Sequence, residues 1–89
     1  MKDLKDTISL MLSDDYRERF KGEYWQTKIR YEKLKDFCNR IEAANMALNV
    51  AEQRHDCPFW LLRQQKKKMG KYLYTLEIRA LHEGIDLED

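Results

Sequence analysis

One heptad-like series of mostly apolar side chains between positions 20 and 41 constrains the fold more than any other feature of the chain. Its members, spaced alternately four and three residues apart, are Phe20, Tyr24, Thr27, Tyr31, Leu34, Cys38 and Ile41. This spacing keeps one side of an α-helix apolar and is typical of a helix that packs lengthwise against another helix. Asp14 and Asp15 precede the series, where the positive end of a helix dipole favours acidic side chains. We therefore predict one long helix over residues 14–44.

Gly22 lies inside this series, where glycine costs about 1 kcal/mol relative to alanine in a helix interior. It therefore indicates a close approach of another element or a local bend. After Ala44 the pattern loosens, and the sequence NMALNVAEQRHD fits a long linker and a frayed extension of the helix equally well.

A second long helix is marked at both of its ends. Pro58 suits a first helical position, because a first helical residue needs no backbone N–H. Gly84 followed by Ile85 has the form of a Schellman stop. The apolar face between these ends comprises Leu62, Met69, Leu73, Leu76 and Ala80. We predict a helix over residues 58–83.

The composition agrees with long helices, since the chain of 89 residues has only 3 Gly and 1 Pro and 37% of its residues are charged. Leu4, Ile8 and Leu12 follow Asp3 at helical spacing and predict a further short helix over residues 3–12. The predicted fold class is all-α, with one domain over residues 1–89. In it, a short N-terminal helix is followed by a long antiparallel helical hairpin.

Both long helices also carry large apolar residues away from their apolar faces. These residues are Trp25, Ile29, Phe37, Trp60, Tyr74 and Ile78. Together they form more apolar surface than a soluble monomer normally exposes. We therefore predict that the chain assembles as a homo-oligomer.

The charge balance excludes several partners. Lys and Arg total 17 against 16 acidic residues, so the formal net charge is +1. A charge this small provides no general attraction to duplex nucleic acid or to an anionic membrane.

The sequence also lacks the run of roughly 20 apolar residues that a membrane-spanning helix needs. Cys38 and Cys57 have no CxxC spacing, which favours reduced thiols in a cytosol.

Catalytic and metal-binding readings find little support. His55 and Cys57 flank Asp56 and could form a Cys/His pair or part of a zinc site. A metal needs three or four ligands at defined spacing, however, and only His82 is left to add. The chain has no nucleophile elbow, no glycine-rich phosphate loop and no HExxH helix. We expect no enzyme activity, no metal and no cofactor.

The basic residues are more informative. Arg63, Lys67 and Lys71 recur every four residues and form a cationic ridge, although such runs are usually solvated faces. Tyr24 and Trp25 stand one turn before Lys28, so this region could offer rings for a nucleobase and an ammonium group for a phosphate. The alternative is that Tyr24 belongs to the apolar series and Trp25 to an oligomer interface. The spacing leaves both interpretations open.

Two segments, EYWQTKIRYEKLKDFCNRI and CPFWLLRQQKKKMGKYLYTLEIRALHEGIDL, together resemble the bacteriophage anti-CBASS sponge family, most closely its T-even phage version. The second segment also resembles a helical hairpin domain shared with sponges that inhibit Thoeris defence. The resemblance implies a non-catalytic protein in the cytoplasm of the infected bacterium. Such a protein sequesters cyclic dinucleotides such as 3′,3′-cGAMP, and in some members cyclic trinucleotides, so that the CBASS effector is not activated.

The resemblance also implies an interlocked homohexamer with ligand sites between protomers. With Lys28, which the spacing above suggests, five positions that the resemblance points to complete six predicted ligand-binding residues: Tyr24, Trp25, Lys28, Asn39, Arg40 and Arg63. Tyr24 would stack on a base. The basic position about four turns later falls on Asn39, so Arg40, together with Lys28, is the preferred phosphate contact.

Two further features of this family correspond to residues here. Trp25 replaces the asparagine that trinucleotide-binding members have next to the stacking tyrosine, a departure that bears on whether a trinucleotide site exists. An arginine of the later helix contributes to the ligand site, and Arg63 is the first candidate, with Arg79 the second.

Two other functions remain open. The chain could be a helical adaptor that binds a host or phage protein through its exposed aromatic faces. It could also bind single-stranded nucleic acid through the basic ridge, in which case its affinity would depend strongly on salt.

Overall fold

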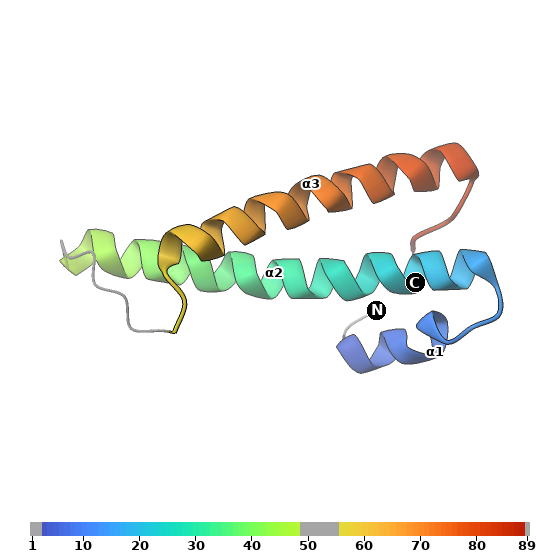
Figure 1. Ribbon diagram of the computed structural model, residues 1–89, viewed down its shortest axis with the longest axis horizontal. Helices are drawn as coiled ribbons and strands as arrows, with labels where there is room; N and C mark the ends of the chain where they lie inside the picture. The colour runs from blue at the N-terminus through green and yellow to red at the C-terminus, as the bar shows by residue number, and fades with distance from the viewer. Residues whose placement is uncertain (1–2, 49–55, 89) are drawn as a thin grey trace.

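The computed structural model describes residues 3–48 and 56–88. It comprises a 3-10 helix, η1 (Leu4–Thr7), and three α-helices, α1 (Ile8–Met11), α2 (Tyr16–Leu48) and α3 (Phe59–Glu83). Figure 1 shows α3 running back along one side of α2, while α1 lies on the other side of α2. The molecule is elongated, with extents of 50 × 25 × 19 Å. The predicted all-α fold with an antiparallel helical hairpin is confirmed.

The helix ends differ from the predicted ones by a few residues. The short helix starts as a 3-10 turn, in which Asp6 N–H donates to Asp3 C=O at 3.0 Å, and a capping box adds the hydrogen bond from Asp3 N–H to Asp6 Oδ2 at 3.0 Å. α2 continues to Leu48, so the frayed-extension interpretation holds that far, and residues 49–55 lie outside the described part. Pro58 is the cap of α3 rather than its first residue. Its extended ψ of 143° delays the helix by one residue, and its carbonyl accepts from Leu61 N–H at 3.1 Å.

The stop signal of the second long helix is confirmed. Gly84 caps α3 with a φ of 70°, a left-handed conformation that costs glycine little. Ile85 N–H donates to Ala80 C=O at 2.8 Å, the hydrogen bond that defines a Schellman motif. The chain then turns away from α3 towards α2.

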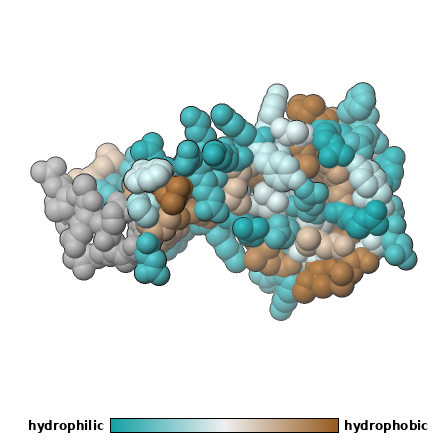
Figure 2. All heavy atoms as spheres, viewed as in Figure 1, coloured by the Kyte–Doolittle hydropathy of each residue, from teal (hydrophilic) through white to brown (hydrophobic). Residues whose placement is uncertain are grey.

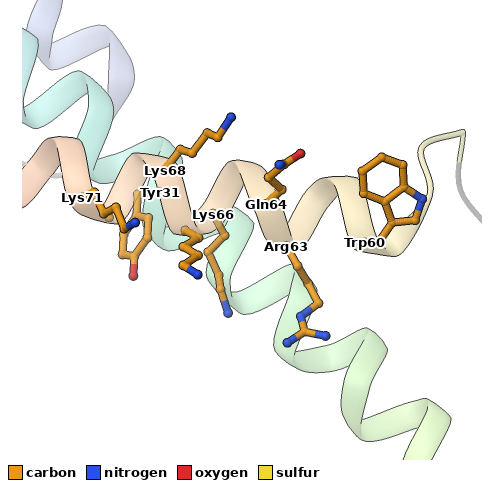
Figure 3. Close-up of a pocket in the computed structure, with 9 residues that line it drawn as sticks. Tyr31, Trp60, Arg63, Gln64, Lys66, Lys68 and Lys71 are labelled. Carbon is orange, nitrogen blue, oxygen red and sulfur yellow. The ribbon is translucent and has the colours of Figure 1, made fainter.

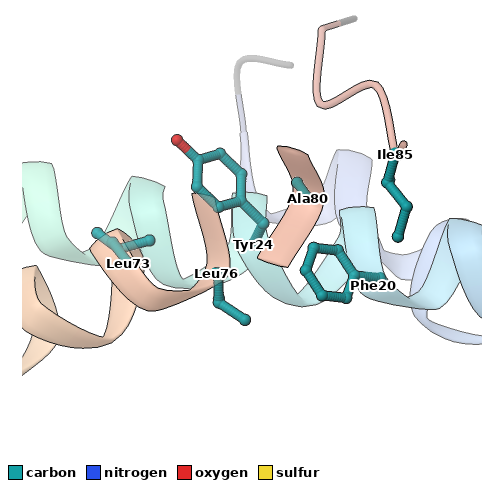
Figure 4. Close-up of a cluster of buried hydrophobic side chains, with 6 residues drawn as sticks. All are labelled: Phe20, Tyr24, Leu73, Leu76, Ala80 and Ile85. Atoms are coloured by element: carbon teal, nitrogen blue, oxygen red, sulfur yellow. The ribbon is translucent and has the colours of Figure 1, made fainter. Parts of the chain in front are cut away.

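The core lies near the end of the hairpin where α2 begins and α3 ends. Six buried side chains form it: Phe20, Tyr24, Leu73, Leu76, Ala80 and Ile85, and Figure 4 shows them between the two helices. Leu76 is the most enclosed of the six, with 1% of its surface exposed. All seven members of the α2 series are buried or half-buried, which confirms the predicted face.

Gly22 marks a close approach and not a bend. A Cβ at this position would lie 3.0 Å from Leu10 Cβ and 3.1 Å from the backbone nitrogen of Met11. The short N-terminal helix therefore packs directly on the α2 backbone, and α2 passes through residue 22 without interruption.

Three tyrosine–glutamate hydrogen bonds connect α2 with α3. They join Tyr16 to Glu83 at 2.9 Å, Tyr24 to Glu77 at 2.8 Å, and Tyr72 to Glu23. Arg79 extends the first pair, since its Nη2 donates to the Tyr16 hydroxyl at 2.5 Å and its Nε to Glu83 at 3.0 Å. The hairpin is thus held by polar bridges as well as by its apolar seam.

Much of the expected apolar surface is exposed. Phe37, Trp60, Tyr74 and Ile78 are exposed as predicted. Trp25 and Ile29, by contrast, are half-buried within the single chain. Figure 2 shows apolar atoms along the edge where α1 lies and near the end of α3. Homo-oligomer formation stays a prediction that this surface favours.

The helices were also compared with the length and apolarity that a membrane span needs. Within residues 3–48 and 56–88, none of the helices carries an apolar stretch long enough to cross a membrane.

Candidate functional site

An open groove of about 650 Å³ lies along the first half of α3, with Tyr31 of α2 at one side. Its size is within the roughly 300–1,000 Å³ that ligand pockets usually have. The lining residues are Tyr31, Trp60, Arg63, Gln64, Lys66, Lys67, Lys68, Gly70 and Lys71. The lining thus contains five basic side chains and no carboxylate.

Gly70 positions Tyr31 in this groove. A Cβ at residue 70 would lie 3.3 Å from Tyr31 Cε1 and 3.4 Å from its hydroxyl oxygen. Because glycine has no side chain, α3 approaches the tyrosine ring closely while the ring stays half-buried. Tyr31 is therefore packed beside α3 and still lines the groove.

The basic side chains of the groove are not neutralised. Arg63, Lys67 and Lys71 follow one another at single-turn intervals, as predicted. In the described part of the chain, none of the five groove cations forms an ion pair. Lys28 and Lys35 on α2, by contrast, both approach Glu32, at 3.5 and 4.0 Å. Positive charge is therefore concentrated along α3.

Aromatic side chains lie towards both ends of the groove. Figure 3 shows Trp60 near the start of α3 and Tyr31 further along, with Arg63 and Lys66 between them. Trp60 is 65% exposed, so its indole is accessible. The Arg63 guanidinium lies 5.7 Å from the Phe59 ring centroid. Rings accept stacked bases and cations accept phosphate oxygens, so the groove suits a nucleotide-like anion.

Of the six predicted ligand residues, Arg63 alone lines this groove. Lys28 is engaged by Glu32. Arg40 is exposed and pairs with Asp36 at 2.9 Å, and Asn39 is exposed beside it. Their roles in ligand binding stay predictions. The groove and these α2 residues do not form one site within a single chain.

Tyr24 belongs to the apolar seam, as one of the two open interpretations held. Its side chain is 6% exposed, and its hydroxyl donates to Glu77 Oε2. Burial, followed by the hydrogen bond to Glu77, raises the pKa of the Tyr24 phenol above its usual range. A stacking role for Tyr24 stays a prediction, and it would require the ring to leave this packing.

Trp25 and Arg79 are both engaged within the chain. Trp25 Nε1–H donates to Leu87 C=O at 2.7 Å, and its ring meets Tyr24 edge-on with centroids 5.4 Å apart. The Arg79 guanidinium lies 4.9 Å from the Phe20 ring centroid, in addition to its hydrogen bonds with Tyr16 and Glu83. Neither residue lines the groove.

Sequence reasoning missed Tyr31 and Trp60 as groove residues. Tyr31 was assigned to the apolar series, and nothing in that series distinguishes it from Tyr24. Gly70, the only glycine within α3, is the signal that could have shown where α2 and α3 approach closely. The cationic ridge beside Gly70, by contrast, was predicted from the sequence.

The described residues contain no group of three or more side chains that could hold a metal ion. His55 lies outside the described part. Cys57 and His82 stand at opposite ends of α3, roughly 35 Å apart at about 1.5 Å per residue, so they cannot share a metal. Burial raises the pKa of the Cys38 thiol, which disfavours the reactive thiolate.

The fold and the groove define a small all-helical hairpin protein with an unneutralised, aromatic-flanked cationic surface. The chain belongs to the Sequestin family, whose model matches residues 14–82. The match includes α2, the groove and nearly all of α3, while η1, α1 and residues 83–88 lie outside it. Comparisons with curated proteins and with solved structures gave no match.

Proposed function

We propose that this protein sequesters cyclic oligonucleotide messengers and returns them unchanged, so that a CBASS effector in the infected bacterium is not activated. One observation supports this most strongly: the groove combines two aromatic side chains with five cations that form no ion pair within residues 3–48 and 56–88, and its lining contains no carboxylate. The family's name, Sequestin, is compatible with sequestering a ligand. The resemblance to phage anti-CBASS sponges supplies the ligand class.

Phosphate recognition falls to the α3 ridge in this proposal. Arg63, Lys67 and Lys71 project from one side of α3, about one turn apart. A cyclic dinucleotide carries two phosphate charges, and an arginine can hold one phosphate by two parallel hydrogen bonds. The lysine ammonium groups act as point charges for the other phosphate.

Base recognition falls to Tyr31 and Trp60. Stacking on an aromatic side chain contributes about 1–3 kcal/mol per base. The Tyr31 ring already packs closely beside Gly70 without a ligand, so in this proposal less entropy is lost when a base stacks on it. Pre-organisation of this kind suits a stoichiometric trap.

The groove also argues against cleavage of the ligand. Its lining contains no His, Asp, Glu, Cys, Ser or Thr, so Tyr31 and the lysines are the groove side chains left that could act as nucleophile or general base. Binding without catalysis is therefore part of the proposal.

A second copy of the chain is part of the proposal. The groove is open along α3, and a ligand held there would keep one side in water. Trp60, Tyr74 and Leu81 are exposed apolar residues that a neighbouring protomer could cover. We propose a homo-oligomer, with the homohexamer that the resemblance implies as its expected form.

The proposal is tested by calorimetric titration with 3′,3′-cGAMP, comparing the natural chain with Lys67→Met and Lys33→Met. Lys33 is an exposed lysine of α2 outside the groove, so each variant removes one surface ammonium. We expect micromolar or tighter binding by the natural chain, about tenfold weaker binding by Lys67→Met and no change for Lys33→Met. Equal effects of both substitutions, or no binding by a folded chain, would refute the assignment.

The alternative is a helical adaptor for another protein. The exposed side chains of Tyr74, Ile78 and Leu81, which lie on α3 outside the groove, favour it. It predicts a chain whose melting temperature is unchanged by any cyclic nucleotide. A thermal-shift screen with cyclic di- and trinucleotides distinguishes the two functions.

A further inference from the structure

The C-terminal segment after α3, residues 84–88, folds back across α2, and we call it the C-terminal strap. Figure 1 shows it returning from the end of α3 to the side of α2. It meets a row of three donors on α2, namely Arg17, Lys21 and Trp25. Because these residues are spaced four apart, their side chains lie on one face of the helix.

Each donor in this row binds a backbone carbonyl at the strap. Arg17 Nη1 donates to Gly84 C=O at 3.0 Å, and its Nη2 donates to Glu83 C=O at 3.3 Å. Lys21 Nζ donates to Glu88 C=O at 2.5 Å. Trp25 Nε1–H donates to Leu87 C=O, as described above. The strap is therefore anchored along its whole length by one helix face.

Two apolar side chains hold the strap against the core. Ile85 is 8% exposed and belongs to the buried cluster, and Leu87 packs against that cluster. A small hollow of about 210 Å³ adjoins the anchors, lined by Arg17 and Lys21 together with Leu10, Glu18, Ile85 and Asp86.

The backbone carbonyls that accept from Arg17 and Lys21 form weaker hydrogen bonds with these cations than an anion would. Arg17 and Lys21 are cations, yet both donate to neutral carbonyls, whereas hydrogen bonds from a cation to an anion are roughly twice as strong. Two acids, Glu18 and Asp86, line the hollow with them. Glu18 accepts from the Ser13 hydroxyl at 2.6 Å, and Asp86 accepts from Glu88 N–H at 3.0 Å.

We propose that the C-terminal strap is a displaceable cover on a second anion site formed by Arg17 and Lys21, which takes a phosphate group. While docked, the strap occupies both donors and adds the negative charges of Asp86 and Glu88. When a phosphate displaces it, those acidic side chains leave with it and the two cations gain a charged acceptor. The site lies on α2, apart from the α3 groove, and does not depend on the function proposed for that groove.

The test observes the strap directly. The indole N–H resonances of Trp25 and Trp60 in a ¹⁵N-labelled chain report the strap and the groove separately, and Trp60→Phe assigns them. On titration with inorganic pyrophosphate, we expect the Trp25 resonance to move as its hydrogen bond to Leu87 is lost. A Trp25 resonance that stays fixed while pyrophosphate saturates the Trp60 signal would overturn the proposal.

Two variants distinguish competition between pyrophosphate and the strap from a simple loss of strap stability. Lys21→Met removes both a cation of the site and the anchor of Glu88. The anion loses a charge-assisted contact, which is stronger than the contact to a neutral carbonyl that the strap loses, so the pyrophosphate concentration that moves Trp25 should still rise severalfold. Leu87→Ala loosens the strap but removes no cation, so that concentration should fall about three- to tenfold. Changes in the same direction for both variants would overturn the proposal, and circular dichroism checks that both chains keep their helices.

Discussion

At the scale of single residues, Tyr24 and Tyr31 show that two tyrosines of one sequence pattern can differ in their exposure. Both belong to the apolar series of α2. Tyr24 faces the buried α3 residues Leu73 and Leu76, so its ring is enclosed and its hydroxyl finds Glu77. Tyr31 faces Gly70 and remains half-buried at the edge of the groove. The partner on the opposite helix, and not the local spacing, decides which tyrosine is accessible.

The buried phenol of Tyr24 predicts a loss of stability in alkali. The folded state raises the pKa of Tyr24, so the unfolded state releases the proton first. The stability that the neutral phenol provides is complete below about pH 10 and decreases as the pH rises towards the folded pKa. Tyr24→Phe should cost about 1.5–3 kcal/mol at pH 7, since a hydrogen bond to a charged group is lost.

Denaturant unfolding at pH 7 and pH 11 measures this effect. The difference between the natural chain and Tyr24→Phe should shrink at pH 11. Tyr74→Phe is the matched control, because Tyr74 is 65% exposed and its substitution should change stability little at either pH. A difference for Tyr24→Phe that is constant between the two pH values would contradict the account.

At the scale of elements, two helical glycines should respond differently to substitution by alanine. Gly22→Ala places a methyl group against the backbone nitrogen of Met11, which cannot move without displacing α1. Overpacking costs typically about 1–3 kcal/mol, and the better helix propensity of alanine returns about 1 kcal/mol. Gly22→Ala should therefore lower the denaturant midpoint or detach α1.

Gly70→Ala meets only the Tyr31 side chain, at 3.3 Å, and a ring can shift by a few tenths of an ångström. We expect unfolding stability to stay equal or to rise, and affinity for 3′,3′-cGAMP to fall severalfold because the shifted Tyr31 ring no longer lies where it stacks best on a base. Chemical denaturation and calorimetry on both variants measure the two outcomes. Lower stability of Gly70→Ala with unchanged affinity would show that Tyr31 does not belong to the ligand site.

The same elements show what the sequence could and could not predict. The 4–3 spacing of α2 and the Gly84 stop were sufficient for the hairpin, because helix periodicity and capping are local. The groove depends on where α2 and α3 approach each other, which Gly70 and Tyr31 decide from distant positions in the chain. The strap was likewise not predicted, since nothing in the sequence near Arg17, Lys21 and Trp25 shows that residues 84–88 return to them.

At the scale of the whole molecule, charge is distributed unevenly despite a net charge of +1. The α3 groove concentrates cations, whereas α2 pairs Lys28 and Arg40 with carboxylates. This distribution allows a protein with little overall charge to attract a small anion locally. Absence of general affinity for duplex nucleic acid stays a prediction that rests on the net charge alone.

Exposed apolar residues lie in two separate regions of the molecule. Ile8, Met11 and Leu12 lie near the N-terminus, and Tyr74 and Leu81 lie on α3. A monomer would leave both regions in water. Assembly of several copies would cover them and would bring neighbouring α3 grooves together, which is how a single-chain groove could become a closed ligand site.

The central claim is that the protein holds a cyclic oligonucleotide and releases it intact. The most direct test incubates the folded protein with 3′,3′-cGAMP, separates the protein from free ligand, denatures the protein by heat and analyses the released nucleotide by chromatography. The account predicts that free ligand is depleted in proportion to protein and that unmodified 3′,3′-cGAMP is recovered after heating. Recovery of linear or shorter products, or no depletion of free ligand before heating, would contradict it.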